Sequence, residues 1–378
     1  MNVLVVSGMW PPDVGGPASH APEVAEYLRS RGHRVAAVTM ANAPPAPEPY
    51  PVRWASRRSP LVWRHAVAVR TVAGAARDAD VVYSTGMIGR SSLGTAIART
   101  PIVVKLTSDP VFERSLRWRL WGADLGGFQH ARGLRIGLLR KARDLELGRA
   151  TRLIIPSEAL RELAIGWGVP PEKVVVIPNP VSPPALEDRE TLRERHGLEG
   201  PTLVFAGRLV PQKAIDVALD AVVANPDVSL VLAGEGPYRE RLERYAQSLP
   251  LDGRARFLGP QPRQTVFELL RAADAALLSS SWENFPHMVV EALSVGTPVI
   301  ATDAGGVSEI LRDDENGLLV PMGDAEALAT AIRRYFDDPT LADRLRAAAP
   351  ASVERFAPEA IYARLESLLE EAASGRAS

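Results

Sequence analysis

Residues 275–302 read AALLSSSWENFPHMVVEALSVGTPVIAT. The stretch opens with a short apolar run, passes through a polar loop into an apolar helical pattern, and ends in a second apolar run. Two short buried strands that flank a helix are typical of a parallel β–α–β unit, because helices cover both faces of a parallel sheet. We therefore predict strands over 275–279 and 299–302, with a helix near 288–295 between them.

The same alternation of short apolar runs and helical patterns extends through the rest of the chain. It favours parallel sheets that are covered by helices on both faces, the doubly wound α/β class. Further strands are predicted over 3–7, 35–39, 81–84, 102–106, 153–156, 174–177, 202–206, 228–233 and 256–258. Further helices are predicted over 21–31, 214–224, 238–249, 306–311 and 325–337.

The length and the charge distribution both indicate two domains. The chain has 378 residues, whereas a single hydrophobic core stops growing at roughly 250–300. A proline-rich stretch at 179–184 is the clearest linker, so we predict domains over 1–182 and 183–357. Residues 1–182 carry 24 Lys+Arg against 14 Asp+Glu (+10), and residues 183–378 carry 20 against 31 (−11). The amphipathic pattern of 358–378 could pack back on the first domain.

Composition excludes several classes of protein. Hydrophobic residues make up 46% and charged residues 24%, which is ordinary for a globular protein and unlike a disordered or collagen-like chain. There is no cysteine, so disulfide scaffolds, thiolate metal sites and cysteine nucleophiles are excluded. The sequence has no run of about 18 apolar residues, so we predict no membrane span. The opening MNVLVV lacks a basic flank, so we interpret it as a strand rather than a signal peptide.

Two glutamates eight positions apart follow the strand at 275–279. Glu283 lies in the loop and Glu291 in the following helix, whose other residues are mostly apolar. Free backbone amides at the start of that helix could face an anion or a sugar hydroxyl. A buried carboxylate such as Glu291 needs a partner, which a ligand hydroxyl could supply. The alternative is a structural one, a glutamate near a helix N-terminus plus a buried ion pair.

Arg208 and Lys213 flank a turn that follows the strand at 202–206. Two cations at the carboxyl end of a parallel strand can converge on phosphate oxygens, because ligands of such sheets bind at that edge. The alternative is that both are ordinary surface cations.

Taken together, these segments resemble the retaining glycosyltransferases of family 4 (glycosyl transferases group 1). The likeness is weak up to residue 150 and strong over 154–320. It implies the GT-B fold, in which two Rossmann-like doubly wound domains face each other across a cleft. It also implies that Glu283 contacts the donor sugar, that Glu291 contacts the nucleotide ribose, and that Arg208 and Lys213 bind the donor diphosphate. The remaining substrate-binding residues that it implies are Gly15, Gly16, Gly207, Gly234, Asn284, Phe285, Pro286, His287, Met288 and Val289.

The chain departs from the family pattern at two positions. Ala214 follows Lys213 where the family usually has glycine, and we expect this to alter only the turn. Many relatives have a histidine in the loop after the strand at 102–106. Here Asp109 is the nearest polar candidate for contacting the donor sugar or acceptor, and we include it among the catalytic residues; alternatively it is an ordinary loop aspartate before proline. For Gly15 and Gly16, likewise, a simple turn is the alternative.

The resemblance implies a retaining hexosyltransferase that moves a sugar from a nucleoside diphosphate donor to an acceptor hydroxyl. The acceptor would be a glycan, a lipid-linked saccharide or a small molecule, and no metal or other cofactor would be needed. Asp78 and Asp80 mimic a metal-binding motif but precede a strand, and the six histidines show no ligand spacing. A sugar-nucleotide epimerase of the same fold and a non-catalytic sugar- or nucleotide-binding protein are the alternatives.

Residues 112–152 contain ten cations with Trp118, Trp121 and Phe128 among them. Such a stretch could lie on an anionic membrane surface or receive a phosphate-bearing acceptor. The alternative is a solvated face whose arginines pair locally. No nucleic-acid-binding motif accompanies the charge, so we expect no nucleic-acid partner. The expected location is cytoplasmic, with a peripheral position on the inner face of the cell membrane as an extension.

Overall fold

The computed structural model describes residues 1–13, 16–118, 120–121 and 125–375, which form two compact units. Among these residues, the first unit comprises those up to Pro178, except Leu125, and those from Glu359 onward. The second unit comprises Leu125 and Asn179–Pro358. The chain thus enters the second unit after Pro178 and returns to the first after Pro358.

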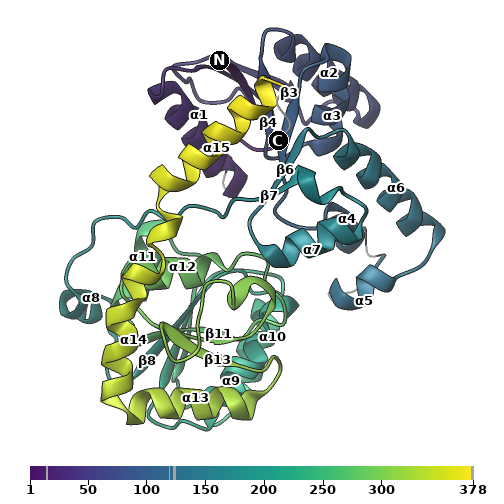
Figure 1. The fold of residues 1–378 in the computed structure, drawn as a ribbon. Coiled ribbons are helices and arrows are strands. Elements are labelled where there is room, and N and C mark those ends of the chain that lie inside the picture. Colours follow the sequence, from purple (N-terminus) through teal and green to yellow (C-terminus); the bar gives the residue numbers. More distant parts are fainter. Residues whose placement is uncertain (14–15, 119, 122–124, 376–378) are drawn as a thin grey trace. The chain divides into compact units, whose positions relative to one another are not determined.

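The first unit is built on a seven-stranded parallel sheet with the order β3-β2-β1-β4-β5-β6-β7 (Figure 1). Its strands are β1 (Asn2–Ser7), β2 (Arg34–Ala41), β3 (Val52–Ser56), β4 (Val81–Ser84), β5 (Ile102–Lys105), β6 (Arg152–Ile155) and β7 (Val174–Val176). Its helices are α1 (Gly16–Ser30), α2 (Leu61–Ala76), α3 (Ile88–Ala98), α4 (Pro110–Arg117), α5 (Leu125–His130), α6 (Leu134–Gly148), α7 (Glu158–Gly166) and α15 (Pro358–Ala373), with a 3-10 turn at Pro171–Lys173.

Each face of this sheet carries its own hydrophobic core. Because side chains alternate along a strand, β1 sends Val3 and Val5 to one face and Leu4 and Val6 to the other. The first face packs against α1 and α15. The second packs against α2, α6 and α7.

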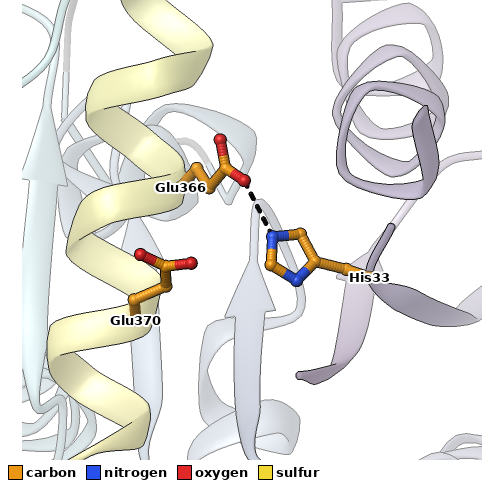
Figure 2. Close-up of side chains that lie close together, drawn as sticks. All are labelled: His33, Glu366 and Glu370. Carbon is orange, nitrogen blue, oxygen red and sulfur yellow. Dashed lines mark hydrogen bonds and ion pairs between the residues drawn. The ribbon is translucent and has the colours of Figure 1, made fainter. Parts of the chain in front are cut away.

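Helix α15, drawn in yellow in Figure 1, docks on the first unit through both apolar and polar contacts. The carboxylate of Glu366 lies 2.8 Å from His33 Nε2 (Figure 2). It also accepts hydrogen bonds from Arg31 Nε (3.2 Å) and Tyr27 Oη (3.3 Å). Burial alone would raise the pKa of Glu366, but the hydrogen bond to His33, the charge of Arg31 and the Tyr27 hydroxyl outweigh it and lower the pKa. This polar cluster fixes the helix at the sheet edge where β2 begins.

The second unit is built on a six-stranded parallel sheet with the order β10-β9-β8-β11-β12-β13 (Figure 1). Its strands are β8 (Thr202–Ala206), β9 (Ser229–Ala233), β10 (Ala255–Gly259), β11 (Ala275–Leu278), β12 (Val299–Thr302) and β13 (Gly317–Val320). Its helices are α8 (Arg189–His196), α9 (Ile215–Val223), α10 (Arg239–Ser248), α11 (Arg263–Ala272), α12 (His287–Ser294), α13 (Ala325–Asp337) and α14 (Pro339–Ser352). Short 3-10 turns lie at Pro211–Lys213, Gly305–Val307 and Glu354–Phe356.

The structure confirms the predicted fold class, with two doubly wound parallel-sheet units, but corrects some of the elements. The helix predicted at 306–311 is wrong, because only a 3-10 turn at Gly305–Val307 forms there. Two edge strands, β3 and β13, were not predicted as strands. In β3, Arg53 and Trp54 are exposed, so this strand lacks the continuous apolar run of a central parallel strand.

Candidate active site

Two loops at the carboxyl edge of the second sheet bring Lys213 and Glu283 together. Strands β8 and β11 are neighbours, so the loops that follow them lie side by side. Lys213 Nζ donates a hydrogen bond to Glu283 Oε1, and Ser280 Oγ donates to the same oxygen at 2.6 Å. The side chain of Glu283 is only 7% exposed, whereas that of Lys213 is 20% exposed. The pair is therefore partly desolvated, which strengthens its electrostatic interaction.

Hydrogen bonds between the two loops fix the geometry of this ion pair. Gln212 Nε2 donates to the Trp282 carbonyl at 2.7 Å, and the Ser281 amide donates to the Gln212 carbonyl at 2.8 Å. Ser279 Oγ donates to the Lys213 carbonyl at 2.9 Å. The two charged side chains are thus held by a network that does not depend on their own attraction.

A third loop, after β12, supports the backbone of Glu283. The Gly306 amide donates to the Glu283 carbonyl at 2.9 Å. Gly305 adopts a φ of +56°, and a Cβ atom there would lie 2.2 Å from the same carbonyl oxygen. Glycine is therefore required at position 305 for both conformation and close approach.

Gly207 and Gly234 meet where the loops after β8 and β9 cross. The Gly207 amide donates to the Ala233 carbonyl at 2.9 Å. A Cβ atom on Gly234 would lie 1.8 Å from the Gly207 carbonyl oxygen. The structure thus explains Gly234 by backbone packing, and substrate binding by these two glycines stays a prediction.

Arg208 lies on the same loop as Lys213 but has a different environment. Its side chain is exposed. Among the residues that the structure describes, no hydrogen-bond or ion-pair partner of its guanidinium is found. A second cation on the loop of Lys213 is therefore available to an anionic ligand.

Glu291 lies on α12 with a side chain that is 18% exposed, and its Oε1 is 3.5 Å from Arg263 Nη1. Burial raises the pKa of Glu291, and the charge of Arg263 only partly opposes this shift. Within the described part of the chain this long ion pair is the one polar contact of the carboxylate, which leaves most of its hydrogen-bonding capacity unused, as expected of a carboxylate that binds a ligand hydroxyl. Ligand binding by Glu291 stays a prediction.

The residues between the two glutamates divide into core and surface. The side chains of Asn284, Phe285, Pro286, Met288 and Val289 are all buried. For the apolar ones, contact with a polar ligand would have to come from backbone amides at the start of α12 rather than from side chains. His287 is exposed, and its Nε2 lies 3.1 Å from Asn179 Nδ2.

In the first unit, Asp109 is the N-cap residue of α4 and is only 2% exposed. Its Oδ1 accepts a hydrogen bond from the Val111 amide at 2.9 Å and lies 3.5 Å from Arg143 Nη1. Its Oδ2 accepts from Gln129 Nε2 at 3.4 Å. These contacts account for the aspartate structurally, and its catalytic role stays a prediction. Gly16 begins α1, and Gly15 lies outside the described residues.

Two family models match the chain, one in each half. The description "Glycosyl transferase 4-like domain" matches residues 15–180, and "Glycosyl transferases group 1" matches residues 188–352. Residues 188–352 therefore belong to the group 1 glycosyltransferases, and the two glycosyltransferase models together span most of the chain.

Individual relatives match the chain to different extents. The chain is 38% identical to the lipopolysaccharide core biosynthesis glycosyltransferase LpsE of Rhizobium meliloti over 147 residues. This aligned segment is 39% of this chain and 43% of LpsE. The chain likewise spans less than two thirds of the length of several other curated relatives with more than 30% identity. An uncharacterized glycosyltransferase of Methanocaldococcus jannaschii is 26% identical over 366 residues, 89% of this chain and 90% of that protein.

Among solved structures, HepE from Anabaena in complex with UDP has a TM-score of 0.79 at 24% identity, covering 98% of this chain and 100% of that one. At this level of identity the likeness concerns the fold, which is GT-B.

One residue that the sequence analysis overlooked is Lys105, the last residue of β5. It is only 5% exposed, and burial lowers the pKa of its amine to about 7. The available signal was a lysine that directly ends an apolar strand at the ligand-binding edge of a parallel sheet.

The basic stretch at 112–152 is partly core rather than surface. Phe128, Arg143 and Arg152 are 0%, 3% and 7% exposed, so they are not available to a membrane. Its exposed residues include Trp118, the α6 leucines Leu134, Leu138 and Leu145, and the cations Arg132, Arg135, Lys141 and Arg149. None of the helices in the described ranges is long and apolar enough to cross a membrane.

The described residues contain one group that could hold a metal ion, formed by His33, Glu366 and Glu370 (Figure 2). It lies where β2 begins, at the sheet edge opposite the carboxyl ends of the strands. Asp80, which precedes β4, lies at that same edge and accepts a hydrogen bond from the Asn2 amide at 2.6 Å. Neither feature is placed at the edge where parallel-sheet enzymes bind their ligands.

Proposed function

We propose that this chain is a retaining glycosyltransferase that transfers a sugar from a nucleoside diphosphate donor to an acceptor hydroxyl. The observation that carries the proposal is the Lys213–Glu283 ion pair at the carboxyl edge of the second sheet, with the guanidinium of Arg208 on the same loop. A carboxylate that can bind sugar hydroxyls and two cations that can bind phosphates are what a sugar–diphosphate requires.

In the proposed reaction, Arg208 and Lys213 stabilise the negative charge that develops on the departing diphosphate. Preorganised charges of this kind are the largest catalytic contribution in many enzymes. The bond from the anomeric carbon to the diphosphate breaks while the acceptor oxygen bonds on the same face. The acceptor proton passes to the departing phosphate, which would explain why no protein base is obvious.

The relatives indicate classes of donor and acceptor to try first. HepE has been crystallised with UDP, and LpsE is named for lipopolysaccharide core biosynthesis. We therefore propose a uridine diphosphate sugar as the donor and a saccharide, free or lipid-linked, as the acceptor.

The test begins with a thermal-shift screen of nucleoside diphosphates, because a ligand that binds the folded state raises its melting temperature. Sugar transfer is then measured with the matching donors, and NMR of the product gives its anomeric configuration. Transfer with retention would support the proposal, whereas an inverted product would reject the retaining mechanism. Interconversion of the donor sugar without transfer would instead favour the epimerase. Binding with no turnover of any donor would favour a binding protein.

We also propose that the first unit contacts an anionic membrane through α6. Leu134, Leu138 and Leu145 are 82%, 59% and 66% exposed and share one side of the helix, with the exposed Lys141 between them. Exposed leucines interleaved with cations fit an anionic lipid surface, where each cation near the surface contributes about 1 kcal/mol.

Liposome sedimentation tests this contact. The wild-type protein should bind anionic but not neutral vesicles, and less at high salt because exposed charges are screened. Leu134→Ser/Leu138→Ser should weaken binding, whereas Leu93→Ser, at an exposed leucine of α3, should not. Absence of binding to anionic vesicles at low salt would reject the membrane contact.

A further inference from the structure

A row of polar residues crosses the carboxyl edge of the first sheet. The register pairs Ser7 with Thr39, and Ser84 with both Val6 and Val104. The next residues along the strands, Thr85 and Lys105, are therefore neighbours. The ladder continues this far, because the Thr85 amide donates to the Val6 carbonyl at 2.9 Å. We call Thr39, Ser7, Thr85 and Lys105 the edge row.

The edge row faces the side of the sheet that α1 and α15 cover. Lys105 pairs with Ile154, and residues paired across a sheet point to the same face. Ile154 belongs to the core that contains the apolar residues of α1 and α15. Val103, two positions before Lys105, belongs to the same core.

Two neighbouring members of this row lack polar partners. Among the described residues, the Lys105 amine makes no hydrogen bond or ion pair although the residue is only 5% exposed. Thr85 Oγ1 is buried and has no hydrogen-bond partner in the same part of the chain. In contrast, Ser7 Oγ donates to the Met9 carbonyl at 2.7 Å. Buried polar groups are almost always paired, so the unpaired Thr85 hydroxyl, beside a lysine amine with no protein partner among the described residues, requires an explanation.

The use of lysine in this chain points in the same direction. The sequence has 44 Lys+Arg, of which only four are lysine: Lys105, Lys141, Lys173 and Lys213. Lys141 is exposed, and Lys173 is half-buried and donates to the Gly148 carbonyl. The other two lie at the carboxyl edges of the two sheets, Lys105 at the end of β5 and Lys213 in the loop after β8. A compact ammonium group suits the binding of a single oxyanion, whereas arginine needs a planar, forked partner.

We propose that Lys105 and Thr85 form a binding site for an oxyanion, a phosphate or carboxylate group, carried by the acceptor substrate. The assignment of this anion to the acceptor rests on the proposed glycosyltransferase function, whereas the binding of an anion at Lys105 and Thr85 does not. The oxyanion accepts hydrogen bonds from the lysine amine and the threonine hydroxyl, which removes both unpaired donors. Burial lowers the pKa of the free amine to about 7, so binding of an anion brings the proton onto the amine and raises the pKa.

NMR of protein labelled with [ε-¹³C]lysine tests this directly, because four lysines give four side-chain signals. Lys105→Arg identifies the Lys105 signal by its loss. In the intact protein, inorganic phosphate should raise the pKa of Lys105 by about one to three pH units, the usual effect of an opposite charge at close range. The signals of Lys141 and Lys173 serve as internal controls. A Lys105 titration that phosphate and acetate leave unchanged would overturn the proposal.

Stability provides a second readout that distinguishes a binding site from a structural lysine. Lys105→Met keeps the volume but removes the desolvated amine, so the melting temperature should rise without ligand. The increase in melting temperature that phosphate produces in the wild type should be lost in Lys105→Met and reduced in Thr85→Val, but kept in Lys141→Met. A lower melting temperature of Lys105→Met without ligand would show that the lysine serves the fold and would overturn the proposal.

A third arm separates the acceptor from the donor. UDP added in place of phosphate should leave the Lys105 signal unchanged, and the same response to UDP as to phosphate would assign the site to the donor and overturn the acceptor assignment. Because none of these readouts needs sugar transfer, phosphate binding without transfer activity would count against the proposed function alone. Conversely, transfer activity with no anion response at Lys105 would count against this site alone.

Discussion

Lys213 and Glu283 form an ion pair although 70 positions separate them in the sequence. They meet because β8 and β11 are neighbours in the sheet, and because hydrogen bonds from Gln212 and Ser281 join the two loops. A buried carboxylate held by one lysine and one serine is preorganised for a ligand, because the side chain loses little conformational entropy on binding.

Arg208→Ala should lower the turnover of the proposed transferase by about 10²–10³, the usual loss when one preorganised charge is removed. The melting temperature should hardly change, because the side chain is exposed. Initial rates at saturating donor measure the effect. Arg312→Ala, which removes an arginine with a side chain that is 72% exposed, is the matched control and should keep full activity. Near-normal turnover of Arg208→Ala would remove its assigned role.

Lys213→Ala should reduce both turnover and stability. It removes a charge from the proposed site and leaves the buried carboxylate of Glu283 without its cation, which costs about 1–3 kcal/mol. In the double variant Lys213→Ala/Glu283→Gln, stability should recover while activity stays low. Chemical denaturation and rate measurements on the same samples test this. If the double variant is as unstable as the single one, the lysine stabilises the loop by another route.

Glu291→Gln should make the protein more stable at neutral pH. The pKa of Glu291 is raised by burial, so its ionisation opposes folding above that pKa and has no effect below its unfolded value of about 4.5. The gain from the substitution should therefore be present at pH 7 and vanish as the pH falls through the raised pKa toward 4. Melting temperatures across this range provide the measurement, and a gain that grows on acidification would contradict the expectation.

The same variant should bind a nucleoside diphosphate more weakly, because its amide replaces one acceptor oxygen with a donor. Titration calorimetry with UDP is a suitable measurement. Unchanged affinity would remove the role that the family resemblance assigns to Glu291.

Ala214→Gly should stabilise the turn after Lys213. Ala214 adopts a φ of +44°, which costs an L-residue about 1–2 kcal/mol. Glycine avoids this strain, although it loses part of the gain through the greater freedom of the unfolded chain. We expect a net increase of about 0.5–1 kcal/mol in the free energy of unfolding. Ala224→Gly, at an exposed residue with a φ of −72°, is the control and should be destabilising.

Activity should survive excess EDTA, because Arg208 and Lys213 are proposed to supply the positive charge that a metal would otherwise provide. The same assay with added Mg²⁺ or Mn²⁺ completes the test. Loss of activity in EDTA that a divalent ion restores would reject the metal-free reaction.

The sequence predicted the sheets well because central parallel strands are uninterrupted apolar runs. It also placed Arg208, Lys213 and Glu283 in loops that follow strands, and Glu291 in the helix after the second of these loops. It could not predict the contact between Lys213 and Glu283, since that contact depends on which strands are neighbours.

Residues with buried polar roles were harder to assign. Asp109 was interpreted as a catalytic candidate, with an ordinary loop aspartate as the alternative, and neither interpretation included its place as the cap of α4 in contact with Arg143. Lys105 was missed because an apolar strand that ends in lysine is read as a core strand that reaches solvent. Burial of a charged side chain depends on tertiary packing, which local sequence does not report.

The return of α15 to the first unit has a consequence for biosynthesis. Ile361, Leu365 and Leu369 complete a core that already contains Val3 and Val5 of β1. On the ribosome, the second unit is therefore fully synthesised before the first can close its own core. Most multidomain chains fold from the N-terminus onward. Here one face of the first sheet stays uncovered until α15, which starts at Pro358, has been translated. Until α15 is made, the nascent first unit therefore exposes apolar surface of the kind that promotes aggregation.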